Sequence, residues 1–262
     1  MPKITFKQFI KAFIPYGFLV LYRKRKKVKA KNGEGDTLKL RLIDRTLTNV
    51  YGTCAEDLLL RVFCEAAGDY KGFYVDIGAF HPIDYSNTNY YYQNGWSGIN
   101  IDASPSSIEK FNEMRKRDIN IETGVSDDYG ELEYYSFDED SSLNTFDRKN
   151  AKKHEDTYNI KVMEIKKVQV QPINVILGKH LTIGQHIDFM TIDVEGFELR
   201  ILKSLDFNKY APDYFLLEDL EIAPKGFDEI ERSPISVFLK TKGYNVVGAV
   251  DWTILYKKEK NI

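Results

Sequence analysis

Short apolar runs alternate with amphipathic stretches along most of the chain. The predicted strands, each a run of mainly apolar residues, are 73–77, 98–101, 119–122, 187–192 and 214–217. The predicted helices, where apolar residues recur with helical spacing, are 55–65, 87–94, 105–117, 196–205 and 234–241. From about residue 38 onward this alternation is typical of a parallel sheet with helices on both faces.

Two further patterns modify this plan. Residues 131–137 and 162–171 alternate like antiparallel strands, and the polar stretch 138–159 between them is predicted to be a loop near the active site. At the end of the chain, 244–250 and 252–256 predict a hairpin that closes the sheet.

The N-terminus has a different composition. Residues 12–22 are mostly apolar but too few to span a bilayer, which takes about 20 residues. A basic run follows at 23–31, and the polar, glycine-containing stretch 32–37 resembles a linker. Residues 1–35 are therefore predicted to be either an interfacial membrane segment or a docked helix followed by a solvated charge run. Residues 36–262 form the predicted catalytic domain.

Charge and cysteine content limit the classes of function. The net charge of −2 gives no whole-domain affinity for nucleic acid, so we expect no nucleic-acid partner. Cys54 and Cys64 have no metal-ligand or CxxC spacing and read as buried thiols in a reducing compartment. We therefore expect a cytoplasmic protein, peripheral at the inner face of the membrane if the N-terminal segment binds lipid.

Acidic residues at the ends of the first two strands indicate a nucleoside ligand. The first strand ends in Asp76-Ile77-Gly78-Ala79, where glycine permits a sharp turn and close approach of a ligand. Asp102 closes the second strand, where its carboxylate can accept hydrogen bonds from both ribose hydroxyls. The G-x-G-x-x-G fingerprint of pyrophosphate binding is absent, which favours a cofactor without phosphates, such as S-adenosylmethionine.

A second acidic pair follows the strand at 187–192. Asp193 and Glu195 are candidates to orient the acceptor, take its proton or bind a metal. Equally, Glu195 and Glu198 could simply stabilise the first turn of the next helix. His81, directly after the glycine turn, is a third candidate base.

Other conspicuous residues have ordinary explanations. Trp96 and the run 90–92 of three tyrosines are expected mainly in the core. His154, His180 and His186 lack partner spacing and are expected at the surface or at helix caps. Residues 141–144 of the polar loop either contact the acceptor or are solvated.

Five segments together resemble the FkbM family of methyltransferases. They are VDIGAFHP (75–82), SNT (86–88), GWSGINIDASP (95–105), GVSD (124–127) and, most specifically, IDVEGFELRIL (192–202). The upstream YGTCAEDLLL (51–60) also resembles this family, although Cys54 stands where many members have a polar residue or glycine. The resemblance implies a Rossmann-like, seven-stranded methyltransferase sheet with helices on both faces. It also implies methyl transfer from S-adenosylmethionine to oxygen.

The resemblance also implies roles for particular residues. Those implied to bind the cofactor are Glu56, Asp76, Gly78, Ala79, Asp102, Ser126 and Asp127, with Ser126 and Asp127 at the end of the third strand near the adenine. Those implied or inferred to be catalytic are Asp193, Glu195 and His81. Family members methylate sugars and macrolide hydroxyls, so the expected acceptor is a sugar hydroxyl of a glycan or glycolipid, with a macrolide as the alternative.

Three other classes of function fit less well. A nicotinamide oxidoreductase would need the missing glycine fingerprint. A nucleic-acid methyltransferase would be expected to have an N/D-P-P-Y motif or a broad basic surface. A catalytically silent glycan-binding protein would be free to lose Asp76, Asp102 and Asp193. If Asp193, Glu195 and Glu218 converge, their mutual repulsion would favour either bound Mg²⁺ or a raised pKa.

Overall fold

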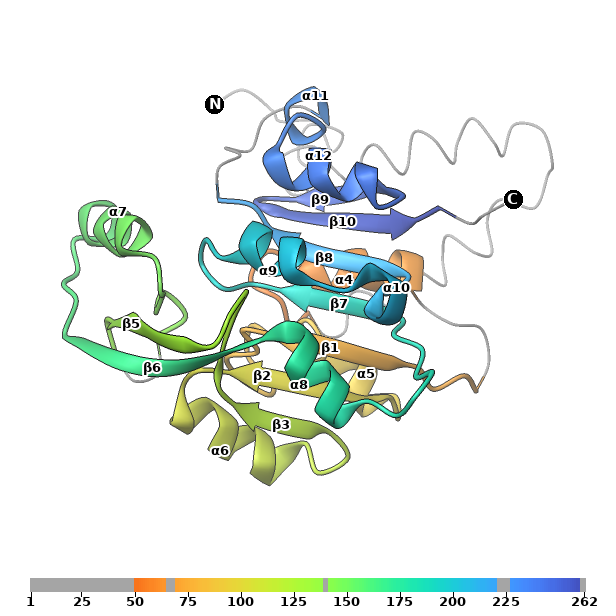
Figure 1. Cartoon of the computed structure of the whole chain (residues 1–262), viewed down its shortest axis with the longest axis horizontal. Helices are drawn as coiled ribbons and strands as arrows, with labels where there is room; N and C mark the ends of the chain where they lie inside the picture. Colours follow the sequence, from red (N-terminus) through yellow and green to blue (C-terminus); the bar gives the residue numbers. More distant parts are fainter. Residues whose placement is uncertain (1–49, 65–68, 139–140, 221–226, 260–262) are drawn as a thin grey trace, which may run out of the picture.

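A seven-stranded sheet forms the centre of the computed structural model, which describes residues 50–64, 69–138, 141–220 and 227–259 (Figure 1). Its strand order is β3-β2-β1-β7-β8-β10-β9. The strands are β1 (Phe73–Ile77), β2 (Ser97–Asp102), β3 (Ile119–Glu122), β7 (Phe189–Ile192), β8 (Tyr214–Glu218), β9 (Tyr244–Val250) and β10 (Thr253–Lys258). The first five in spatial order are parallel, and β10 pairs antiparallel with β8 and β9. This is the predicted Rossmann-like methyltransferase sheet, closed by the predicted hairpin.

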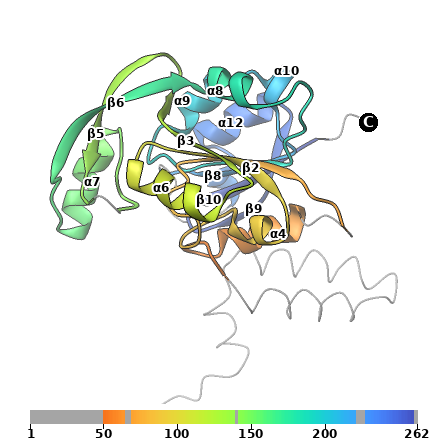
Figure 2. The same ribbon diagram turned by 90° about the horizontal axis from the view of Figure 1, so that it is seen from below.

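Alternation of side chains along the strands gives the sheet two apolar faces. In β1, Val75 and Ile77 belong to a core cluster with residues of α8 (Ile173–His180), α9 (Glu198–Ser204) and α12 (Pro234–Thr241). Tyr74 belongs to the opposite cluster, with residues of α4 (Glu56–Cys64) and α5 (Asn89–Gln93). Helices therefore cover both faces, and Figure 2 shows this layering from below. α6 (Pro105–Met114) packs against β2 and β3.

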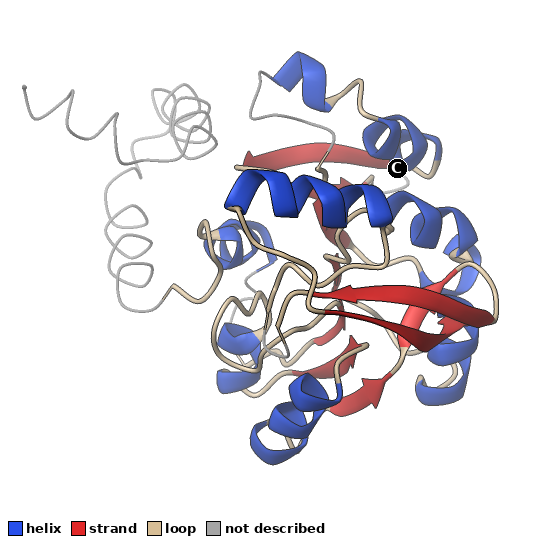
Figure 3. Ribbon diagram, turned by 90° about the vertical axis from the view of Figure 1, so that its left-hand side faces the viewer, coloured by secondary structure: helices blue, strands red, loops and turns tan. Residues whose placement is uncertain are grey.

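A smaller unit projects beyond the carboxyl ends of the parallel strands. It contains a three-stranded sheet with the order β4-β6-β5, made of β4 (Gly124–Ser126), β5 (Gly130–Ser136) and β6 (Glu164–Pro172). The antiparallel pairing of β5 with β6 confirms the sequence prediction. The helix α7 (Arg148–Tyr158) lies across this side of the molecule, as Figure 3 shows.

The prediction that 138–159 is entirely a loop was wrong, because 148–158 are α7. The helix is very polar, and Ala151 and His154 are its buried residues. Its start is fixed instead by Asp147, whose side chain accepts the backbone N–H groups of Lys149 and Asn150. The helix is therefore held by a local cap and by the packing of Ala151 against Tyr135 and Phe137, which a search for long apolar stripes does not detect.

Most other predicted elements were found within a few residues of their expected positions. Pattern analysis gave no separate assignment to α8, β4, or the short helices α10 (Phe207–Tyr210) and α11 (Phe227–Ile230). Trp96 and Tyr91 are buried as expected, while the rings of Tyr90 and Tyr92 pack against Arg61 and Arg117. Cys64 is buried, but Cys54 is only partly buried and its thiol contacts Asp251, unlike the expected apolar site.

The predicted N-terminal segment and the boundary at 35–36 lie outside the described residues. Within the part of the chain that the structure describes, no helix has the length and apolar character to cross a membrane.

Candidate active site

The loop after β1 and the loop after β7 touch each other at Gly78. This residue has φ +77°, and a Cβ built there would lie 1.7 Å from the carbonyl oxygen of Asp193. The next turn continues with Phe80 at φ +53°, while the N–H groups of Gly78 and Ala79 donate to the carbonyl of Ile101. Only glycine permits this approach, so the sequence at 78 joins the ends of β1, β2 and β7 into one site.

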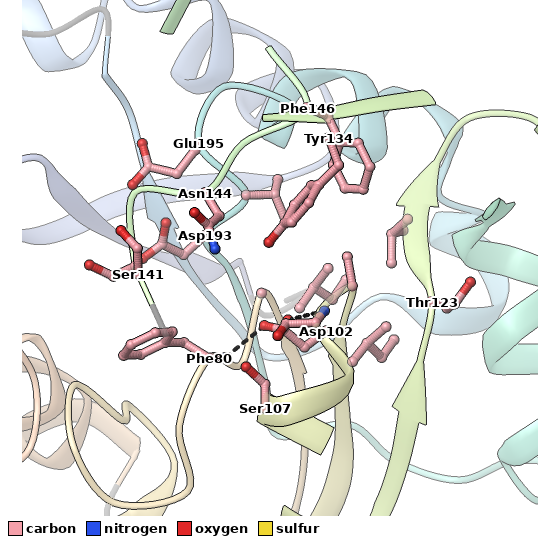
Figure 4. A pocket seen from close by; sticks show the side chains of 18 residues that line it. Phe80, Asp102, Ser107, Thr123, Tyr134, Ser141, Asn144, Phe146, Asp193 and Glu195 are labelled. Carbon is pink, nitrogen blue, oxygen red and sulfur yellow. Dashed lines mark hydrogen bonds between the residues drawn. The ribbon is translucent and has the colours of Figure 1, made fainter. Parts of the chain in front are cut away.

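A pocket opens at this junction, between the large sheet and the projecting unit (Figure 4). Its empty volume, which includes the open solvent at its mouth, is about 580 Å³. Figure 4 shows it with two ends: Asp102, Ser107 and Thr123 lie at one, and Asp193, Glu195 and Ser141 at the other. We call these the Asp102 end and the Asp193 end.

Asp102 is held by backbone donors at the end of β2. Its Oδ2 accepts the N–H of Phe80 at 2.8 Å, and its Oδ1 accepts the N–H of Ser104 at 2.7 Å. Each carboxylate oxygen can accept a second hydrogen bond, so the group retains capacity for two ligand hydroxyls. Burial raises its pKa and the backbone donors oppose that shift.

Two aromatic side chains from the projecting unit complete the Asp102 end. Tyr134 of β5 and Phe146 line the pocket, and their rings pack with centroids 4.8 Å apart. Burial raises the pKa of Tyr134, which keeps its phenol neutral. Thr123 and Val125 form the adjoining wall. The sequence analysis did not identify these four residues, because their contribution depends on how the small sheet packs over β2.

The Asp193 end carries a cluster of acids. One oxygen atom each of Asp193, Glu198 and Glu218 lies within 4.8 Å of the others. Glu198 is buried, and its carboxylate accepts the backbone N–H groups of Val194 and Gly196. Of the three acids whose convergence would favour a metal, Asp193 and Glu218 therefore lie close together, and the third close member is Glu198 instead of Glu195.

Burial and charge repulsion together raise the pKa values in this cluster. Two effects raise the pKa of Asp193 well above its ordinary value: burial by the surrounding protein, and then the charges of Glu195 and Glu198. Part of the residue is nevertheless exposed to solvent at the pocket. Asp193 and Glu218 share a hydrogen bond, and burial together with Asp193 raises the pKa of Glu218. The Oε2 atom of Glu218 is buried without a hydrogen-bond partner among the described residues. A cationic ligand would relieve this arrangement.

Glu195 lines the same end but has a different environment. It has φ +54°, and its Oε2 lies 3.1 Å from Nε2 of His154 in α7. The expectation that His154 lies at the surface or at a helix cap was wrong: the residue is 6% exposed. Sequence spacing gave no signal, because 41 positions separate the two partners. His186 is exposed as expected, and His180 is in the last turn of α8.

Several other predicted site residues do not line the pocket. Asp76 points into the protein, where its Oδ2 accepts the hydroxyl of Thr88 at 2.9 Å and burial raises its pKa to about 7. Ala79 is buried directly behind Gly78. His81 uses Nδ1 to accept the N–H groups of Ile83 and Asp84, and so stabilises its own turn.

Ser126 and Asp127 were expected at the end of the third strand, and this placement was wrong. The chain leaves the large sheet after Glu122, so Ser126 ends β4 of the small sheet instead. Asp127 pairs with Arg200, with 2.6 Å between Oδ1 and Nε. Gly124–Ser126 form hydrogen bonds with β6, which explains why the chain leaves the large sheet at this point.

Glu56 begins α4 and accepts the N–H of Cys54 at 2.8 Å. It does not line the pocket, but its charge contributes to the raised pKa of Asp193. The structure thus brings Gly78, Asp102, Asp193 and Glu195 together at the pocket, with Glu56 within electrostatic range.

Comparison with known proteins gives one family. The family described as "Methyltransferase FkbM domain" matches residues 76–246. A crystal structure of methyltransferase FkbM from Methylobacillus flagellatus KT is similar with 12% sequence identity and a TM-score of 0.39. The alignment covers 78% of this chain and 53% of that one, so this chain spans about half the length of the solved protein. The search of curated proteins gave no match.

Proposed function

The chain belongs to the FkbM methyltransferase family, and from that premise we propose that it transfers the methyl group of S-adenosylmethionine to a hydroxyl oxygen of a sugar. The observation that carries the proposal is the single pocket region in which Gly78, Asp102, Asp193 and Glu195 meet. The acceptor is a glycan or glycolipid in this proposal, and a macrolide hydroxyl is the alternative within the same chemistry.

The Asp102 end fits a nucleoside. Asp102 already takes one backbone donor on each oxygen and can accept the two ribose hydroxyls on its remaining lone pairs. Tyr134, Phe146 and Val125 provide the apolar surface that a purine ring requires. Gly78 lets the loop after β7 approach the loop after β1, so that both loops line the pocket.

The Asp193 end fits the charged part of the same cofactor. S-adenosylmethionine carries a sulfonium and an ammonium group, whose positive charge complements these acids. A positive ligand would favour the ionised form of Asp193, whose pKa is otherwise raised by burial and by the neighbouring carboxylates. Glu56, close enough to contribute to that pKa, is a further candidate to face the ammonium group.

A divalent metal is the alternative cation for this cluster. The three oxygens within 4.8 Å of one another would suit Mg²⁺, which prefers carboxylate ligands. However, both oxygens of Glu198 are already engaged by backbone N–H groups. The cofactor's own charge is therefore the better explanation for the acids.

The acceptor is proposed to enter beside Phe80, Ser141 and Ser142. Figure 4 shows Phe80 and Ser141 near the acids at the Asp193 end. Hydroxyl side chains and an aromatic ring suit a sugar, which offers both hydroxyl groups and apolar ring faces. A flat apolar acceptor would gain nothing from the two serines.

The chemistry requires little beyond positioning and proton removal. When bound, the cofactor supplies an electrophilic methyl group. Asp102 holds the ribose, and the loops joined at Gly78 fix the reacting end. Asp193 accepts the proton of the acceptor hydroxyl on its carboxylate, which Glu218 supports by hydrogen bonding.

A methyl-transfer screen tests this proposal. Purified protein with labelled S-adenosylmethionine should methylate one of a panel of hexose and deoxyhexose glycosides, and Asp193→Asn should lower turnover by about 10²–10⁴-fold. Cofactor affinity should stay within a few-fold in that variant. Labelling of macrolides alone would replace the sugar with the alternative acceptor, and wild-type turnover by Asp193→Asn would place the base elsewhere.

The metal alternative is tested in the same assay. We expect wild-type turnover to persist in EDTA, since the acids are proposed to face the cofactor. Loss of turnover in EDTA that Mg²⁺ restores would show that the cluster holds a metal.

A further inference from the structure

The conformation of Glu195 needs support from its surroundings. Its φ of +54° lies in the left-handed region, which is unfavourable for a residue with a Cβ. Gly196 follows with φ +109°. A turn of this kind persists only where neighbouring groups fix it.

The segment from Thr145 to His154 supplies that support. The hydroxyl of Thr145 donates to the carbonyl oxygen of Glu195 at 3.0 Å, and the side-chain amide of Asn150 donates to the same oxygen at 2.7 Å. His154, one helical turn beyond Asn150, contacts the carboxylate of Glu195. One face of α7 thus holds both the backbone and the side chain of Glu195.

Gly196 is required for this contact. A Cβ at position 196 would lie 2.2 Å from Nδ2 of Asn150, so any other residue would push the amide away from the carbonyl. On the inner side, Glu198 accepts the N–H of Gly196. The turn is therefore fixed from within by Glu198 and from outside by α7.

The surroundings of His154 restrict the orientation of its imidazole ring. Its side chain is 8% exposed and that of Glu195 is 13% exposed, so little water competes for the contact. The imidazole packs between Phe137, in an edge contact, and Tyr158, in a stacked one. His154 therefore presents a nitrogen in a fixed position to Oε2 of Glu195, a residue that lines the pocket.

We propose that His154 is a positioning residue, which with Asn150 and Thr145 holds the Glu195 carboxylate so that it accepts a hydrogen bond from a second hydroxyl of the sugar acceptor, next to the hydroxyl whose proton goes to Asp193. The inference rests on the proposed function and adds the group that orients the acceptor beside Asp193. It also gives the projecting unit a role: α7 sets the geometry of the acceptor end without itself touching the cofactor end.

Kinetic variants test this role. His154→Ala should lower kcat on the order of 10²-fold, the effect expected when a contacting group shifts by about 1 Å. The affinity of this variant for S-adenosylhomocysteine, measured by calorimetry, should stay within twofold of the wild-type value. Such binding would show that the variant is folded. His154→Gln retains an N–H donor and should recover at least tenfold of the lost kcat.

His186 provides a matched control. Its Nε2 lies 3.2 Å from Oδ2 of Asp213, a similar histidine–carboxylate pair away from the pocket. His186→Ala should keep wild-type kcat. If the wild type is active and His154→Ala is equally active, the positioning role is wrong. If the wild type methylates no acceptor, the proposed function fails instead.

A spectroscopic measurement tests the contact without any acceptor. The chain has four histidines, so ¹⁵N-histidine labelling gives four imidazoles, and the signal lost in His154→Gln identifies His154. Glu195→Gln should shift the Nε2 resonance of His154 and leave that of His186 unchanged. An unchanged His154 resonance would overturn the proposed pairing.

Discussion

Gly78 and Gly184 have the same left-handed φ of +77°, but only Gly78 lies against another backbone. At Gly184 a Cβ would meet nothing within 4 Å, whereas at Gly78 it would lie 1.7 Å from the carbonyl of Asp193. The two positions therefore separate the cost of the left-handed conformation from the cost of the clash between loops.

Alanine substitutions measure that difference. Gly184→Ala should lower the free energy of unfolding by about 1–2 kcal/mol, the cost of a Cβ in the left-handed region. Gly78→Ala should cost clearly more, because the backbone of β7's loop must also move. Urea denaturation of both variants checks this, and equal midpoints would contradict the close approach of the two loops.

The sequence predicted some of the residues that line the pocket, but it also pointed to residues that do not line it. Gly78, Asp102, Asp193 and Glu195 follow directly from strand ends, which meet at one edge of a parallel sheet, and all four line the pocket. Asp76 is the penultimate residue of β1, but its side chain points into the protein and bonds to Thr88. A sequence motif does not show to which face of the sheet a given side chain of the strand points.

At the scale of elements, α7 shows what pattern analysis misses. Its stability depends on a cap and on contacts with a separate small cluster, in which Ala151 packs with Tyr135 and Phe137. Because the cap at Asp147 also precedes the residues that hold Glu195, the start of the helix and the acceptor end are linked.

The cap can be removed with a matched control. Asp147→Ala should cost about 1 kcal/mol, weaken hydrogen-exchange protection in α7 and lower methyl transfer several-fold. Asp206, which caps α10 by accepting the N–H of Asn208, lies elsewhere in the fold. Asp206→Ala should cost a similar amount without lowering turnover. Equal turnover in both variants would show that α7 is only a cover.

At the scale of the whole molecule, the predicted architecture was correct. Buried strands such as Phe189–Ile192 carry a strong, local signal, and the hairpin at the end of the chain closes the sheet as expected. The site is less predictable, because Tyr134 and His154 reach it through the packing of the small unit on the large sheet. Contacts between residues tens of positions apart leave no periodicity in a single sequence.

The whole account depends on a nucleoside cofactor bound at the end of β2. Asp102 and Glu122 are register partners on neighbouring strands, yet only Asp102 lines the pocket. The two acids are therefore a matched pair for one experiment.

The most direct measurement is calorimetric titration of S-adenosylhomocysteine into the wild-type protein, Asp102→Ala and Glu122→Ala. We expect the wild type and Glu122→Ala to bind within twofold of each other. Asp102→Ala should bind at least about tenfold more weakly, a loss of 1.4 kcal/mol or more. Absence of binding to the wild type, or equal binding to Asp102→Ala, would contradict the account.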